Sequence, residues 1–221
     1  MQPNPESRIY SLRTSKRTVK AKGMDATQWH FGRIRPYNYP TRRIAAMSQL
    51  IHKSSGSLMM YFLPTCEKAA VSDTDTFLRN IRKELLNLLI LEPEGYWETH
   101  ANFGKGGTRK VKLIGDKRAL DIMVNKILPV AYVWAVESES RKLQEAILNI
   151  YSSSTKLQEN RIFSQVESQI FSEAQPMHLI KPTAQIQQGT MRLYKNFCVD
   201  QLCDLCPILD NNAILLHKDS D

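Results

Sequence analysis

Apolar residues recur at helical spacing in one segment after another of this chain, and this periodicity constrains its fold more than any other feature. Helices are predicted over 41–53, 75–91, 117–136, 140–152, 157–172 and 183–198. The predicted buried face of the segment 75–91 is formed by Leu78, Ile81, Leu85, Leu88 and Leu89. Strand patterns are scarce beside these helices. We therefore expect a mainly α fold, a single helical domain of about six helices with a basic, partly disordered N-terminal arm.

Two of the predicted helices carry details that a structure can check. In the segment 41–53, Ile44, Met47, Leu50 and Ile51 share one face, the pattern of a stripe that packs on a core. Pro129 lies inside the segment 117–136 and lacks a backbone N–H. That helix should therefore kink or split at the proline.

The net charge of +8 is concentrated at one end of the chain. Residues 1–53 contain eleven Lys and Arg against Glu6 and Asp25, whereas the other 168 residues contain 19 basic and 20 acidic side chains. Such asymmetry indicates a polyanion partner, most often nucleic acid, and a solvated arm is the alternative. We expect a flexible basic arm over 1–28, the helical domain over 29–216 and a polar tail over 217–221.

Nothing in the sequence indicates export or a membrane partner. No run of about 18 apolar residues occurs, and the basic N-terminus lacks the apolar segment of a secretory signal. We therefore expect a cytoplasmic protein. In that compartment the four cysteines would be thiols or metal ligands and not disulfides.

Three cysteines near the C-terminus form the pattern Cys198-x4-Cys203-x2-Cys206. Two residues between thiolates place both on one side of a tight turn, as zinc and iron–sulfur loops do. The pattern predicts a site for zinc or an iron–sulfur cluster, with His217 or Cys66 as the fourth ligand. The alternative is that Cys198 and Cys206 are small buried side chains that pack the last helix.

Two basic segments are candidates for contact with nucleic acid. The first interleaves Arg33, Arg35, Arg42 and Arg43 with Trp29, Phe31, Tyr37 and Tyr39. Guanidinium groups bind phosphate and aromatic rings stack on bases, but arginines beside prolines also tie loops to helices. We favour that structural role for Arg35 and Arg43 and leave Arg33 and Arg42 open. The second segment is a glycine-rich loop with Lys105, Arg109, Lys110 and Lys112, for which a solvated turn is the alternative.

No recognised catalytic signature occurs in the chain. Glu98 and His100 bring a carboxylate and an imidazole near one another, an arrangement that can serve acid–base chemistry but is more often structural. The enzyme hypothesis therefore depends on Glu98 and His100, or on the cysteines as a redox centre.

Several motifs occur in a fixed order along the chain. They are Trp29 with Arg33-Ile-Arg-Pro-Tyr-Asn-Tyr-Pro-x-x-Arg43, Tyr96-Trp97-x-x-His100-x-x-Phe103-Gly-Lys, Leu113-x-Gly115, Asn125-x-x-x-Pro129, Glu159-Asn160, Gln187-Gln188-Gly189 with Tyr194, and the cysteine triplet. Over residues 29–209 this order resembles the C-terminal half of an uncharacterised bacterial family, domain of unknown function 2851. The resemblance supports metal binding by the triplet but neither candidate fourth ligand.

Longer members of that family also have an N-terminal half that resembles a PD-(D/E)XK nuclease. The resemblance implies that this chain is a helical accessory domain without that half. It would bind nucleic acid or a nuclease-type protein partner and would not itself be a nuclease, because the residues that would cut are missing.

Overall fold

The protein was examined as a computed structural model of all 221 residues. It describes Asp25, Gln28 and residues 38–104, 106, 109–158, 160–170 and 183–208, with the side chain of Ile170 left out; these are the described residues below. The chain divides into two units, Met1–Arg35 and Pro36–Asp221. In the first unit the backbone N–H of Gln28 donates to Asp25 O in a turn, at 3.0 Å.

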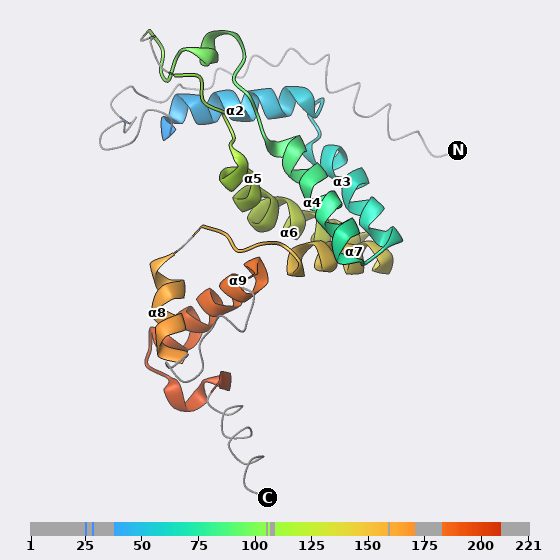
Figure 1. Ribbon diagram of the computed structural model, residues 1–221, viewed down its shortest axis with the longest axis vertical. Helices are drawn as coiled ribbons and strands as arrows, with labels where there is room; N and C mark the ends of the chain where they lie inside the picture. The colour runs from blue at the N-terminus through green and yellow to red at the C-terminus, as the bar shows by residue number, and fades with distance from the viewer. Residues whose placement is uncertain are drawn as a thin grey trace, which may run out of the picture. The chain divides into compact units, whose positions relative to one another are not determined.

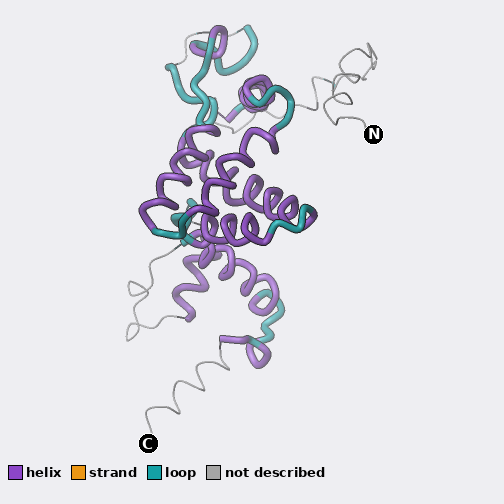
Figure 2. The backbone as a smooth tube through the Cα atoms, turned by 90° about the vertical axis from the view of Figure 1, so that its right-hand side faces the viewer, coloured by secondary structure: helices purple, strands orange, loops and turns teal. Residues whose placement is uncertain are grey.

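The second unit is built from α-helices (Figures 1 and 2). They are α2 (Pro40–Lys53), α3 (Leu58–Lys68), α4 (Asp75–Leu89), α5 (Asp116–Ile122), α6 (Leu128–Glu137), α7 (Arg141–Ser152), α8 (Arg161–Ile170) and α9 (Ala184–Leu193). The described residues contain no β-strand; isolated bridges join Leu91 to Ile114 and Thr155 to Thr183. The predicted mainly α fold is confirmed.

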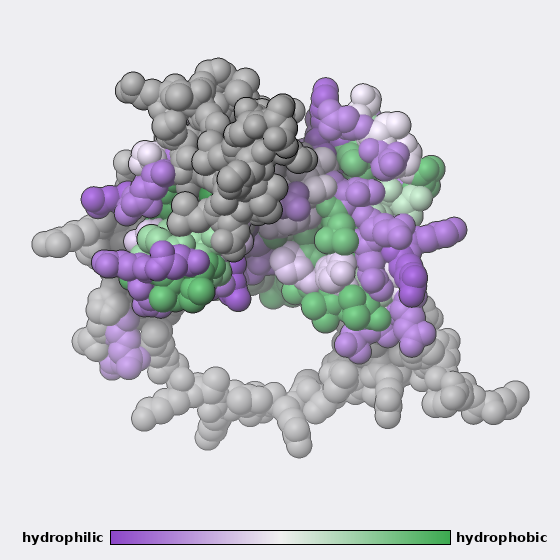
Figure 3. All heavy atoms as spheres, turned by 90° about the horizontal axis from the view of Figure 1, so that it is seen from below, coloured by the Kyte–Doolittle hydropathy of each residue, from purple (hydrophilic) through white to green (hydrophobic). Residues whose placement is uncertain are grey.

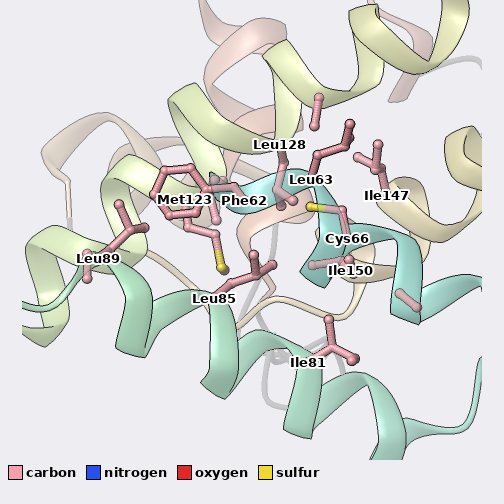
Figure 4. Close-up of a cluster of buried hydrophobic side chains, with 14 of the residues drawn as sticks. Phe62, Leu63, Cys66, Ile81, Leu85, Leu89, Met123, Leu128, Ile147 and Ile150 are labelled. Atoms are coloured by element: carbon pink, nitrogen blue, oxygen red, sulfur yellow. The ribbon is translucent and has the colours of Figure 1, made fainter. Parts of the chain in front are cut away.

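The core lies among α3, α4, α7 and the helix formed by α5 and α6 (Figure 4). Its fully enclosed side chains include Phe62, Leu85, Leu89, Met123, Leu128 and Ile150. The predicted stripe of α4 is confirmed for Leu78, Ile81, Leu85 and Leu89, while Leu88 is half-buried. Burial of side chains this large supplies most of the stabilising free energy of such a domain.

Helix α3 is the element that the periodicity failed to predict. Its sequence is apolar almost all round, and Pro64 lies inside it. A proline in a helix interior removes one hydrogen bond and costs about 3 kcal/mol. Phe62, Leu63 and Cys66 are buried on this helix, and their packing against α4 and α7 offsets that cost.

The apolar stripe predicted for the first helix is confirmed at Leu50 and wrong at its other three residues. In α2, Ile44, Met47 and Ile51 are 53%, 50% and 46% exposed. The face turned inward instead carries Thr41, Arg42, Ala46 and Leu50. Hydrogen bonds from Thr41 and Arg42 to the segment 97–111 set this orientation, so polar contacts outweigh the apolar pattern.

The kink or split predicted at Pro129 takes the form of a π-helical turn just before the proline, and the helix continues through this turn. The π-helical turn η5 (Met123–Ile127) joins α5 to α6, and Pro129 lies in the first turn of α6. A proline ring clashes with the carbonyl four residues earlier, here that of Asn125. Widening the turn at 123–127 relieves this clash and keeps one continuous helix.

That continuous helix, Asp116–Glu137, is long and apolar enough to cross a membrane by length and composition. Core helices of globular proteins pass the same test. The helix buries Ala119, Met123, Val124, Leu128, Ala131 and Ala135 in the core, while Val130, Val133 and Trp134 are exposed. Exposed apolar side chains are a wider feature of the molecule: on the face shown in Figure 3, hydrophobic groups gather beside hydrophilic ones.

Candidate functional site

Three adjoining hollows lie along the segment 153–160, which connects α7 to α8. Leu157 and Gln158 line both the first and the second hollow, and Leu120 lines both the second and the third. We call the three together the cationic groove. They are named below by their side chains as the amide, lysine and arginine hollows.

The amide hollow has a volume of about 430 Å³ and lies between α5, η5, the segment 157–160 and α9. Among the described residues, five with carboxamide side chains line it: Asn125, Gln158, Asn160, Gln187 and Gln188. Gln188 Nε2 donates to Asn125 Oδ1 at 3.0 Å, across 63 residues of sequence. Asn125 lies on the π-helical turn, a feature frequent at functional sites.

Gln187 fixes the geometry of this hollow. Its side chain is 2% exposed, its Oε1 accepts from Leu157 N at 2.8 Å, and its Nε2 donates to Gln158 O at 2.9 Å. A buried carboxamide that satisfies two backbone groups of a loop holds that loop firmly. The segment that lines all three hollows is thereby attached to α9.

The other two hollows are more strongly cationic. The lysine hollow, about 490 Å³, is lined by Lys117 and Lys156 beside Leu120, Leu157 and Gln158. The arginine hollow, about 550 Å³, holds three cations and several hydroxyl groups. These are Arg79, Arg82 and Lys83 with Ser153, Ser154, Thr155 and Thr183.

Positive charge dominates the groove as a whole. Among the described residues, its lining contains seven Lys and Arg, namely Arg79, Arg82, Lys83, Lys117, Arg118, Lys126 and Lys156, and two carboxylates, Asp75 and Asp121. Each carboxylate already has an arginine partner, Asp75 with Arg79 at 3.4 Å and Asp121 with Arg118 at 3.7 Å. Within the described residues, Arg82, Lys83, Lys117 and Lys126 form no ion pair.

The arginines predicted to contact nucleic acid have different environments. Arg33 and Arg35 lie outside the described residues, as does Lys105. Arg42 is 2% exposed and donates to the carbonyl oxygens of Trp97, His100 and Val111, whereas Arg43 is exposed. The structural role therefore falls to Arg42, which the sequence left open, and not to Arg43, for which the sequence favoured it.

In the glycine-rich loop, Arg109 and Lys110 are exposed. Lys110 Nζ lies 3.5 Å from Glu98 Oε1, and Lys112 Nζ lies 3.3 Å from Asp116 Oδ2. Ion pairs this exposed contribute little to stability, so these lysines keep their capacity to contact an anion.

Glu98 and His100 have separate partners. The ring of His100 stacks on that of Tyr96, with centroids 3.9 Å apart, and its Nδ1 lies 2.9 Å from Tyr96 O. Glu98 pairs with Lys110 instead. No hydrogen bond joins Glu98 to His100 in the part of the chain that the structure describes, so the geometry favours the structural alternative for this pair.

The three C-terminal cysteines lie close together but not as a ligand set. Burial raises the pKa of the Cys198 thiol, and the nearby Cys206 and Cys203 raise that pKa further. Among the described residues, however, no three His, Cys, Asp or Glu side chains are grouped so as to hold a metal ion. The donors do not fit zinc or an iron–sulfur cluster in this arrangement, and the metal site stays a prediction.

Neither candidate fourth ligand joins the cysteines. His217 lies outside the described residues. Cys66 is fully enclosed in the core, and burial, with a smaller effect of Glu67, raises the pKa of its thiol to about 12 (Figure 4). The alternative of small buried side chains does not hold fully either, because Cys198 and Cys206 are only half-buried.

Alkylation rates should separate the thiols of Cys203, Cys198 and Cys66. We expect Cys203, which is exposed, to react first with iodoacetamide at pH 8, Cys198 more slowly, and Cys66 only on unfolding, because the thiolate is the nucleophile. Peptide mass spectrometry of timed samples measures each rate, and Cys66 is the internal control for the folded state. If the triplet binds zinc, added Zn²⁺ must slow all three C-terminal thiols together; slowing of none would remove the metal prediction.

The cationic groove was missed because its cations are scattered through a part of the chain whose charges nearly balance. The sequence motifs nevertheless indicated some of the residues that line the groove. Asn125, Asn160 and the pair Gln187-Gln188 belong to three separate motifs, and the structure brings all of them to the amide hollow.

Comparison with known proteins identifies the family. A model described as Protein of unknown function (DUF2851) matches residues 7–161. No curated protein and no solved structure matches the chain. The matched region begins earlier than the motifs suggested and ends before the cysteine triplet, which therefore gains no support from it. Because the match covers well over half of its residues, the chain belongs to the DUF2851 family.

Proposed function

We propose that this chain binds nucleic acid in the cationic groove. The observation that carries the proposal is the lining of the groove, in which seven Lys and Arg face two carboxylates that are already paired. Phosphate backbones supply most of the affinity of nucleic acids for proteins, and they do so through Lys and Arg. Unpaired cations along a groove meet that requirement.

The length and the chemistry of the groove favour a polymer over a small anion. Cations occur in all three hollows, so a chain of phosphates meets several of them, whereas a single anion meets one set. Carboxamides are the side chains that read adenine edges, and Asn125 and Gln188 lie beside Lys126 in the amide hollow. The eleven Lys and Arg of residues 1–53 would raise the association rate through net charge.

This proposal assigns the chain a binding role in a reducing compartment such as the cytoplasm, and no catalytic step. A nuclease-type protein, the partner implied by the family resemblance, would then act on the bound strand. Co-purification of such a protein that survives nuclease treatment of the lysate would instead indicate a direct protein contact.

Charge reversal in the groove tests the proposal. We expect Lys117→Glu with Lys126→Glu to weaken binding of a labelled 20-base-pair duplex by at least about tenfold at 50 mM salt. The slope of log K against log salt should fall by about 1.8, since each lost phosphate contact contributes about 0.9. Fluorescence anisotropy across a salt series measures both values.

The matched control is Arg141→Glu with Lys142→Glu, which makes the same change in net charge at two exposed positions outside the groove lining. We expect this pair to change affinity less than about threefold. An equal loss in both pairs would mean that net charge alone drives binding. Absence of any binding by the wild-type chain at 50 mM salt would overturn the proposal.

A further inference from the structure

The arginine hollow differs from the rest of the groove in how densely its cations are placed. Arg79, Arg82 and Lys83 share this one hollow, and Asp75 is the only carboxylate among the described residues that line it. The ion pair between Asp75 and Arg79 is weak, because the two side chains are 70% and 68% exposed. The hollow therefore carries a net charge of about two positive units.

Among the three cations of this hollow, Arg82 is the one whose charge a bound anion would stabilise most. It is half-buried, and within the described residues it has no carboxylate at ion-pair distance. Burial lowers the pKa of its guanidinium, which means that the protein disfavours this charge in the absence of a ligand. A partly desolvated cation gains more from an incoming anion than an exposed one does.

The guanidinium of Arg82 is also held in position. Its Nη1 donates to Ser153 Oγ, and Ser153 Oγ in turn donates to Asn149 O at 2.5 Å. This contact occupies one of five N–H donors, and the others remain for a ligand. Ser153 and Thr183 add hydroxyl groups to the same lining.

We propose that the arginine hollow binds the terminal phosphate of a nucleic-acid strand, with Arg82 and Lys83 as its charged contacts. This inference rests on the proposed function. An internal phosphodiester carries one negative charge, whereas a terminal phosphate monoester carries about 1.5 to 2 at pH 7. The excess of about two positive charges matches the terminal group, and the arginine hollow is at one end of the series of three.

The test compares strands that differ only in their ends. We expect the wild-type chain to bind a 12-mer with a 5′-phosphate or a 3′-phosphate about tenfold more tightly than the same strand with hydroxyl ends. In Arg82→Gln the preference should fall to less than about twofold, and the affinity for the hydroxyl strand should fall less than the affinity for the phosphorylated strand, because Arg82 is one of seven cations of the groove. Lys142→Gln, outside the groove, should keep the full preference.

Two further measurements guard against a trivial loss of folding. Ser153→Ala keeps the charge of Arg82 but releases its guanidinium, and should reduce the preference by about threefold. Inorganic phosphate at 10 mM should raise the Tm of the wild type by about 3 °C over chloride at equal ionic strength, and should not raise that of Arg82→Gln. Equal affinity of the wild type for both kinds of strand, or a preference that survives in Arg82→Gln, would overturn the inference.

The outcomes also separate this inference from the proposed function. Binding of strands without a preference for phosphate ends would retain the groove and exclude the terminal-phosphate site. Stabilisation by inorganic phosphate without binding of any strand would exclude the proposed function and the strand as ligand, and retain a phosphate site at Arg82.

Discussion

Replacement of Arg42 with methionine should destabilise the protein by about 3–5 kcal/mol. Arg42 Nη1 donates to Trp97 O at 3.1 Å and to His100 O at 2.9 Å, and its Nη2 donates to Val111 O at 2.6 Å. Methionine has a similar length but no donor, so the three carbonyl groups would lose their charged partner in a buried place. Each such loss costs about 1–3 kcal/mol.

Part of this cost is offset because a buried cation is itself expensive, and methionine removes that expense. The offset is incomplete here, because the carbonyl groups are fixed by the backbone of the segment 97–111 and remain without the guanidinium. Arg42→Lys separates the two effects. It keeps the charge, but its single ammonium cannot reproduce the planar fork that reaches three carbonyls, and we expect a loss of about 2 kcal/mol.

The neighbouring residue supplies the control. Arg43→Met makes the same chemical change one position along α2, at an exposed side chain, and should change the free energy of unfolding by less than about 0.5 kcal/mol. Urea unfolding followed by circular dichroism measures all three variants. A loss below about 1 kcal/mol in Arg42→Met would show that the three hydrogen bonds contribute little.

Arg42 also shows where inference from sequence stops. The stripe of Ile44, Met47 and Ile51 is a correct observation about spacing, yet these side chains are half exposed and Arg42 is enclosed. Spacing identifies a helix but does not say which face is buried when a polar contact competes. The carbonyl partners of Arg42 belong to residues that follow it by 55 to 69 positions in the chain. No pattern among neighbouring residues therefore predicts these hydrogen bonds.

The helices themselves were largely predictable. Predicted segments 41–53, 75–91 and 140–152 correspond to α2, α4 and α7 within one or two residues, because each has a polar face and clear limits. Helix α3 has no clear polar face and contains Pro64. Hydrophobic periodicity and the helix-breaking effect of proline therefore both argue against a helix here. It forms because the core surrounds Phe62 and Cys66 on all sides.

The candidate site was less predictable than the fold. The sequence predicts a binding surface from basic residues that lie close together along the chain. The cations of the groove instead come from α4, α5, η5 and the segment 153–160. Helices α4 and α5 and the segment 153–160 also carry acidic residues, so the charge averages out along the sequence and separates only in space. Motif residues of no obvious chemistry, such as Gln187 and Gln188, were the better guide to the site.

Gln187→Ala should cost about 2–3 kcal/mol and loosen the groove without changing any charge. The substitution removes the acceptor of Leu157 N–H and the donor to Gln158 O, both within the segment that lines all three hollows. Other contacts between this segment and α9 remain: the hydrogen bond from Ala184 N to Ser154 O, the bridge of Thr155 with Thr183, and the hydrogen bond from Asn160 Nδ2 to Met191 Sδ. These contacts lie on either side of Leu157 and Gln158, so the middle of the segment should open locally.

Hydrogen exchange distinguishes this local opening from global unfolding. In Gln187→Ala the amide of Leu157 should exchange at least about tenfold faster, while amides of α4 keep their protection. Gln185→Ala, an exposed position two residues earlier on the same helix, is the matched control and should leave Leu157 unchanged. Unaltered protection of Leu157 in Gln187→Ala would mean that the segment is held without the buried carboxamide. If the groove binds nucleic acid, the same variant should also lose affinity although all seven cations remain, because the cations must be held in place to act together.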